Sequence, residues 1–247
     1  MDRQIRYCTT EDGVRIAYNV EGDGPPLLII PTLWAASSLL HELPGWDDFL
    51  ARISKGRTLI TLDARGTGLS QRESIGDASV LAFGLDAMGV LDAAGFDRCT
   101  LMASGPMGPA AISCATRHGG RYAALILIGS WARITEAPRE VLRPIASVAR
   151  ANWEAAARII AGWNLRRGLT EASKLASIYL RSAHGEWVAR TIEENLEVDV
   201  TDMLEQVQAR TLVIHAEDDP FYPFAEAQLM SAQIPDARLL PLPGNLS

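Results

Sequence analysis

The sequence has few of the residues that mark disulfide-bonded, metal-binding or nucleic-acid-binding chains. Its 247 residues include only four histidines and three cysteines, and Cys8, Cys99 and Cys114 show neither CxxC nor histidine-rich spacing. We therefore expect reduced thiols, no metal site and no cofactor. No lysine and arginine cluster is long enough to follow a phosphate backbone, and the net charge is -7, so nucleic acid is not an expected partner.

Long apolar runs are also missing. The amino terminus, "MDRQIRYCTTEDG", is polar, and no run approaches the roughly 18 to 20 apolar residues that a membrane-spanning helix needs. We expect a cytoplasmic protein with no membrane partner. A hydrophobic content of 48% predicts a globular domain with a sizeable core, and a homodimer is compatible with this composition.

Short apolar runs alternate with helical patterns along most of the chain. Two alternating segments around the turn "EDG" predict an antiparallel hairpin at a sheet edge. Buried strands are predicted for "PPLLIIP", "RTLITLD", "CTLMAS", "AALILIG" and "RTLVIHA", with amphipathic stretches between them and Gly95 ending one predicted helix. This order predicts an α/β fold with a mostly parallel sheet and helices on both faces.

The alternation stops after Trp131 and resumes near Gln208. We predict a core formed by residues 1–131 and 209–247, and a helical lid formed by residues 132–208. Such an insertion would lie over the carboxyl ends of the strands, where parallel sheets bind ligands. Its aromatic residues at helical spacing either face a pocket or pack in the interior: Trp153, Trp163, Tyr179 and Trp187.

Several segments together resemble the α/β-hydrolase fold family, in particular the hydrolase-like domains fused to bacterial transcription regulators or nucleotide cyclases. The matching stretches are "IRYCTTEDGVRIAYNVEGDGPPLLIIP", "LDARGTGLS", "LDAAGFDRCTLMASG", "VDVTDMLEQVQARTLVIHAEDDPFYPFAEAQ" and "IPDARLLPLPG". In "LDARGTGLS", Asp63 and Arg65 are expected to brace the turn. The resemblance implies a serine at a sharp turn between a strand and a helix, a histidine base, and an acid that orients the histidine.

The elbow segment "LMASGPMGPAA" departs from that pattern. Alignment places Gly105 at its apex, where glycine offers no nucleophile, and Pro106 follows without the backbone N–H that would bind an oxyanion. Ser104 lies one residue earlier and, by strand alternation, should point away from the exposed side of the elbow. A one-residue slip would make Ser104 the nucleophile and Gly105 the donor of the N–H.

The resemblance also implies a second backbone N–H that binds the oxyanion, in the loop "PTLWAASS". In this loop Trp34 either lines the pocket or packs elsewhere. The predicted pocket residues combine this loop, the elbow and the strand end before the lid: Thr32, Leu33, Trp34, Gly105, Pro106, Met107 and Trp131.

The acid position matches Asp219, in "LVIHAEDDPFYP", which could alternatively only hold its turn. The base position has no counterpart. In the family a histidine follows the last strand, whereas this sequence reads "LPLPGNLS", and His41, His118, His184 and His215 lie elsewhere.

Two functions therefore follow from the residues. The favoured prediction is a non-hydrolytic pseudoenzyme that binds a small apolar or amphipathic molecule as a sensory module. The alternative is a serine-type, esterase-like hydrolase of small organic substrates that uses Ser104, or a histidine supplied by residues beyond Ser247. A non-hydrolytic enzyme that only positions a substrate in the pocket is a third hypothesis.

Overall fold

A computed structural model of the chain describes residues 4–164, 169–219 and 221–244. Within these residues, one sheet contains eight strands in the order β1-β2-β4-β3-β5-β6-β7-β8. The strands are β1 (Arg6–Thr9), β2 (Arg15–Gly22), β3 (Pro26–Ile29), β4 (Thr58–Leu62), β5 (Cys99–Ser104), β6 (Tyr122–Ile128), β7 (Arg210–Ala216) and β8 (Ala237–Leu242).

The sheet combines a hairpin with a parallel block, as the sequence predicts. Strands β1 and β2 pair antiparallel at one edge, and β2 continues antiparallel on β4. The other neighbouring pairs, from β4 through β3 to β8, are parallel. Parallel strands need crossover connections, which the helices supply. The predicted mostly parallel α/β sheet is therefore confirmed.

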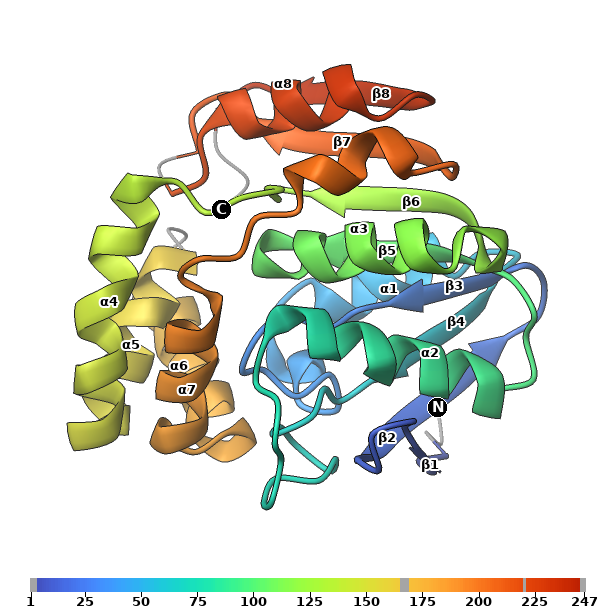
Figure 1. Cartoon of the computed structure of the whole chain (residues 1–247). Helices are drawn as coiled ribbons and strands as arrows, with labels where there is room; N and C mark the ends of the chain where they lie inside the picture. The colour runs from blue at the N-terminus through green and yellow to red at the C-terminus, as the bar shows by residue number, and fades with distance from the viewer. Residues whose placement is uncertain (1–3, 165–168, 220, 245–247) are drawn as a thin grey trace.

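Helices cover both faces of the sheet (Figure 1). On one face the core includes residues of α2 (Phe83–Ala93), α3 (Gly108–Arg117) and α8 (Phe224–Gln233). On the other face α1 (Trp46–Ile53) packs Phe49, Leu50 and Ile53 on apolar strand residues. Short 3-10 turns complete the described elements: η1 (Leu40–Glu42), η2 (Val80–Ala82), η3 (Gly105–Met107), η4 (Gly119–Arg121) and η5 (Thr201–Gln206).

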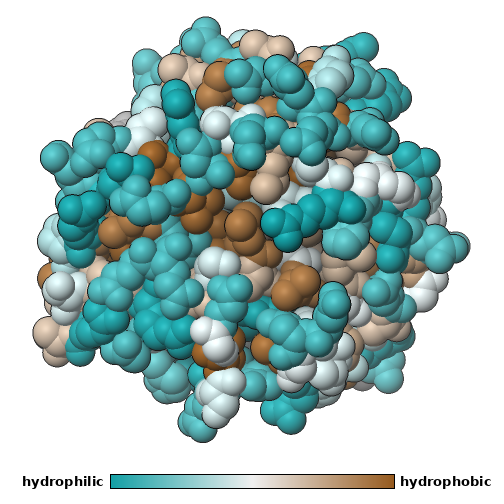
Figure 2. Space-filling view, in the orientation of Figure 1, coloured by the Kyte–Doolittle hydropathy of each residue, from teal (hydrophilic) through white to brown (hydrophobic). Residues whose placement is uncertain are grey.

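Four helices between β6 and β7 form what we term the helical insertion: α4 (Glu136–Ala151), α5 (Trp153–Asn164), α6 (Leu169–Ser182) and α7 (Gly185–Asn195). They stack beside the core at the carboxyl ends of the parallel strands (Figure 1). Figure 2 shows hydrophobic residues reaching the surface where the insertion meets the core. None of the helices in the described residues is long and apolar enough to cross a membrane.

The turn after β4 is braced by two charged side chains. Asp63 accepts hydrogen bonds from the Ser38 hydroxyl at 2.9 Å and from the Leu69 backbone N–H at 2.9 Å. Arg65 is fully buried and pairs with Asp86 at 2.8 Å and Asp12 at 2.6 Å. The predicted brace therefore exists, although the partners of Arg65 lie in α2 and in the hairpin turn.

We expect Arg65→Met to destabilise the fold strongly. Asp86 is completely buried, and removing its cationic partner would leave an uncompensated charge. The loss of unfolding free energy should be about 3 to 5 kcal/mol in chemical denaturation. The double variant Arg65→Met/Asp86→Leu, which removes both charges, should recover part of that loss. Equal losses in the single and double variants would contradict the prediction.

Candidate active site

A cavity of about 440 Å³ lies between the core and the helical insertion. Its walls include most of the predicted pocket residues, together with the two predicted catalytic positions: Thr32, Leu33, Trp34, Ser104, Gly105, Pro106, Trp131 and Asp219. Met107 is not among the lining residues, because its side chain is fully buried in the core. The loops after several strands therefore meet at one cavity, as expected for the carboxyl ends of parallel strands.

The elbow between β5 and α3 has the backbone that the alignment implies. Ser104 is extended, with φ -130° and ψ 152°, whereas Gly105 is left-handed, with φ +53°. Pro106 opens η3, where its fixed φ is tolerated. An added Cβ on Gly105 would meet nothing nearer than Tyr222 Cε2 at 3.9 Å. The apex thus has room for a side chain but carries none.

A close contact behind the apex holds the elbow. The Ser130 hydroxyl, in the segment after β6, donates a hydrogen bond to the Gly105 carbonyl at 2.7 Å. An added Cβ on Gly108 would lie 1.8 Å from the Ser130 Oγ atom. Glycine at 108 therefore lets α3 begin close enough to β6 for Ser130 to reach the elbow.

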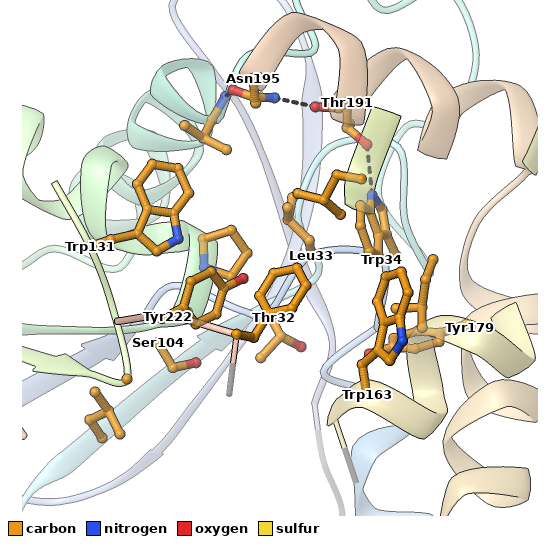
Figure 3. Close-up of a pocket in the computed structure, with 18 of the residues that line it drawn as sticks. Thr32, Leu33, Trp34, Ser104, Trp131, Trp163, Tyr179, Thr191, Asn195 and Tyr222 are labelled. Atoms are coloured by element: carbon orange, nitrogen blue, oxygen red, sulfur yellow. Dashed lines mark hydrogen bonds between the residues drawn. The ribbon is translucent and has the colours of Figure 1, made fainter. Parts of the chain in front are cut away.

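The Ser104 side chain lines the cavity, although strand alternation predicted that it points away from the exposed side of the elbow. It shares its sheet face with Met102, which α1 covers, but Ser104 is the last residue of β5 and is only partly buried. Among the described residues, its hydroxyl has no hydrogen-bond partner. Figure 3 shows Ser104 beside Tyr222, with its hydroxyl directed toward Thr32.

The loop after β3 links the cavity to the insertion. The backbone of Trp34 is left-handed, with φ +69°. This conformation is energetically unfavourable for a residue with a bulky side chain. Its Nε1 atom donates to the Thr191 hydroxyl of α7 at 2.7 Å, and its ring meets Tyr179 of α6 edge-on at 6.5 Å. Within the described residues, the backbone N–H of the preceding residue, Leu33, has no hydrogen-bond acceptor.

Asp219 sits in a turn after β7. Its Oδ1 atom accepts the backbone N–H groups of Phe221 at 2.9 Å and Tyr222 at 2.8 Å, as aspartate commonly does in turns. Its Oδ2 atom has no partner among the described residues. Burial raises the pKa of the Tyr222 phenol, and the Asp219 charge adds to this effect, so the phenol stays neutral.

No histidine lies among the described residues that line the cavity. His41 and His118 are exposed, and His184 pairs with Arg72 at 3.0 Å. His215 is fully buried in β7, where its Nδ1 atom lies 2.9 Å from the Ala216 carbonyl and its ring meets Phe224 edge-on. The histidine base implied by the resemblance is therefore missing from the cavity over the described range.

The helical insertion supplies much of the cavity wall, and the sequence predicted only some of these lining residues. Of the four aromatic residues left open between pocket and interior, Trp163 and Tyr179 line the cavity. Trp153 instead donates to the Ala183 carbonyl at 2.9 Å, and Trp187 packs on the turn at Gly66. Further lining residues carry no motif: Leu142, Ile160, Leu175, Thr191, Ile192, Asn195, Phe221 and Tyr222.

Within the described residues, no group of three His, Cys, Asp or Glu side chains could hold a metal ion. The three cysteines are free, and burial raises the pKa of each thiol, Cys8 and Cys114 to about 11 and Cys99 to about 12. None of the three lines the cavity. The hydroxyl and carboxylate groups at the strand ends are therefore the reactive groups of this site.

Comparisons with known proteins relate the chain to hydrolases. No protein-family model matches it. A protein of Pseudomonas savastanoi pv. phaseolicola, named as the carbamate hydrolase RutD, is 25% identical over 217 residues, covering 85% of this chain and 84% of the relative. The chain is also similar to many solved structures, including an enol-lactonase and an esterase. The enol-lactonase from Burkholderia xenovorans LB400 has a TM-score of 0.82 and 20% identity, covering 96% of this chain and 91% of the other. An esterase from Thermogutta terrifontis has a TM-score of 0.81 and 25% identity, covering 97% and 90%.

These relatives overturn the prediction of a non-hydrolytic pseudoenzyme or sensory module. That prediction depended on the missing serine at the apex and the missing histidine, whereas the relatives are named for hydrolysis of carbamates, lactones or esters. The error was to treat one arrangement of nucleophile and base as the only route to hydrolysis. Ser104, one residue before the apex, still presents a hydroxyl to the cavity.

We expect Gly108→Ala to destabilise the chain by about 1 to 3 kcal/mol, because the new methyl group would overlap the Ser130 Oγ atom. The matched control is Gly162→Ala in α5, where an added Cβ meets nothing within 4 Å. The control should leave stability unchanged or raise it by up to about 1 kcal/mol. Urea unfolding of both variants measures the difference, and equal effects would refute the close-contact argument.

Proposed function

The chain has an α/β-hydrolase fold, and we propose that it is an esterase-like hydrolase of small organic substrates in which Ser104 is the nucleophile. The observation that carries this proposal is the position of the Ser104 hydroxyl. Ser104 lines the cavity at the end of β5, and its hydroxyl forms no hydrogen bond with any described residue. The names of the relatives support the same reaction class.

In the proposed reaction the Ser104 Oγ atom attacks the carbonyl carbon of an ester. The Oγ–C bond forms, and the Ser104 proton leaves to a base. Collapse of the tetrahedral intermediate breaks the bond to the alcohol, which departs with that proton. Water then attacks the acyl-enzyme and gives one proton to the same base. The bond between the acyl carbon and Oγ breaks, the base returns that proton to Oγ, and the acid and the free serine are released.

Two backbone donors support charge stabilisation at the carbonyl oxygen. With Ser104 as nucleophile, the next residue is Gly105, which carries an N–H, so the missing N–H of Pro106 no longer matters. The second donor is Leu33, whose N–H lacks an acceptor within the described residues and which lines the same cavity. Preorganised donors of this kind supply a large part of the rate enhancement in acyl transfer.

We assign Asp219 as the proton acceptor. It is the one Asp, Glu, Lys, Arg or His side chain among the described lining residues. Its Oδ1 atom is held by the two backbone donors of its turn, which leaves Oδ2 to take the proton directly or through a bound water. The two predicted catalytic residues thus have distinct roles in this proposal.

Three finer features of the sequence analysis stay predictions: a cytoplasmic location, a homodimer, and kinship with domains fused to transcription regulators or nucleotide cyclases. None of them is needed for the proposed reaction. The assignment of residues 132–208 as a lid that covers the substrate belongs to the same proposal, because those helices contribute to the cavity wall.

We expect a fluorophosphonate probe to label Ser104 covalently. The wild-type mass should rise by one probe adduct in intact-mass spectrometry, and Ser104→Ala should abolish the adduct. The control Ser231→Ala, at a half-buried position in α8 outside the cavity, should label like the wild type. A wild-type chain that takes no probe while a known serine hydrolase is labelled beside it would refute Ser104 as the nucleophile.

We expect Asp219→Asn to lower the rate of ester hydrolysis by about 10² to 10⁴-fold, the usual contribution of a general base. Asparagine keeps an oxygen for the two backbone N–H groups, so the turn should survive and only the base is lost. The control Asp218→Asn removes a neighbouring exposed carboxylate. An unchanged rate in Asp219→Asn would place the base elsewhere.

A further inference from the structure

The cavity wall combines aliphatic residues with a set of aromatic side chains. Seven aromatic side chains line it, from the core and from the insertion: Trp34, Trp46, Trp131, Trp163, Tyr179, Phe221 and Tyr222. Figure 3 shows Trp131 and Tyr222 on one side, and Trp34, Trp163 and Tyr179 on the other. Aromatic walls bury planar apolar ligands well, because ring contacts add to the burial of apolar area.

Part of this wall is a continuous chain of ring contacts. Trp163 of α5 stacks on Phe221 at 5.7 Å, with an interplanar angle of 28°. Phe221 meets Tyr222 edge-on at 4.8 Å, and Tyr222 lies 6.3 Å from Trp131. Three separate segments of the chain therefore present their rings to one cavity.

The polar groups of the insertion that reach the cavity are already bonded within the protein. The Thr191 hydroxyl accepts from Trp34 and donates to the Val188 carbonyl at 2.8 Å. The Asn195 amide accepts a hydrogen bond from the Val80 N–H at 2.6 Å and donates one to the Ala78 carbonyl at 3.1 Å. They have little capacity left for a substrate.

The available polar groups gather at one end of the cavity. The Thr32 and Ser104 hydroxyls have no hydrogen-bond partner among the described residues, and both lie at the ends of parallel strands. In Figure 3 the Ser104 hydroxyl points toward the side of the cavity on which Thr32 lies. The cavity thus offers one polar end for a single carbonyl group and apolar walls for the rest of the molecule.

The charges of the lining residues limit which ligands can bind. None of the described lining residues is Arg, Lys or His, so an anion entering the cavity would lose its hydration without gaining a cationic partner. The Asp219 carboxylate would repel that anion as well. The site therefore discriminates against substrates that carry a carboxylate or phosphate.

We infer that the substrate is an ester that carries an aromatic ring and no negative charge, with its carbonyl at Ser104 and Thr32 and its ring against the chain from Trp163 to Trp131. This inference rests on the proposed hydrolase function and adds the substrate class. A small anionic carbamate or dicarboxylate ester does not match the apolar, cation-free wall.

The test compares three non-hydrolysable ligands that share one ring system and differ in charge. They are 2-acetylnaphthalene, which is neutral, 2-naphthoate, which is an anion, and 2-naphthylmethyl-trimethylammonium, which is a cation. Titration calorimetry on the wild-type chain should show at least tenfold tighter binding of the neutral ketone than of the anion 2-naphthoate. The cation should bind more tightly than the anion, because the Asp219 carboxylate and the ring faces attract a quaternary ammonium. Equal or tighter binding of the anion would overturn the inference.

A variant pair tests the location of the ring. Phe221→Leu removes the ring that contacts both Trp163 and Tyr222, and it should weaken ketone binding about fivefold, in line with the value of an aromatic pair. The control Phe96→Leu makes the same change after α2, where Phe96 packs against the core and does not line the cavity. Equal affinities in the two variants would contradict the placement.

Failure of this inference is distinguishable from failure of the proposed function. The ketone cannot be hydrolysed, so its binding reports the substrate class without turnover. Selective ketone binding with no hydrolysis of 2-naphthyl acetate would refute the hydrolase proposal alone. Hydrolysis of p-nitrophenyl acetate at Ser104 with no preference for the ketone would refute the substrate class alone.

Discussion

The close approach of β6 to the start of α3 is the constraint on which the site depends. Ser130 can hold the Gly105 carbonyl only because Gly108 has no side chain in the space that the Ser130 hydroxyl occupies. This contact keeps the left-handed turn at Gly105 directly after β5. Because this left-handed turn ends β5, Ser104 is the last residue of the strand and lies at the cavity.

A second link connects this edge of the sheet to the helical insertion. Trp34 has an unfavourable left-handed backbone conformation, and its indole N–H donates a hydrogen bond to the Thr191 hydroxyl of α7. Two residues later, the Ala36 N–H donates to the Ser182 hydroxyl at the end of α6 at 2.9 Å. These bonds between core and insertion are buried, so they help to maintain the strained conformation of the loop after β3. The loop and the insertion therefore form one structural unit around the cavity.

The chemical character of the cavity follows from where polar groups find partners. Within the insertion, side chains such as Thr191 and Asn195 are bonded to the backbone or to Trp34, which leaves rings and aliphatic groups to face the cavity. At the strand ends the backbone changes direction, and Ser104 and Asp219 retain oxygen atoms without partners among the described residues. The reactive groups thus come from the strand ends of the core, whereas the binding surface comes from both the core and the insertion.

The sequence by itself determined the sheet, the hairpin at its edge and the break in alternation after Trp131, because burial period and backbone preference are local properties. The position of Gly105 at the apex of the elbow came from the resemblance to the α/β-hydrolase fold family. Only the tertiary structure decided that Ser104 lines the cavity, that Met107 does not, and that Arg65 pairs with Asp86. Likewise, Trp163 and Phe221 stack although 58 positions separate them in the printed sequence. Such contacts depend on how distant segments pack, and no local pattern records that packing. For the same reason the local absence of an apex serine and a nearby histidine misled the functional prediction, since a cavity assembles its reactive groups from several strand ends.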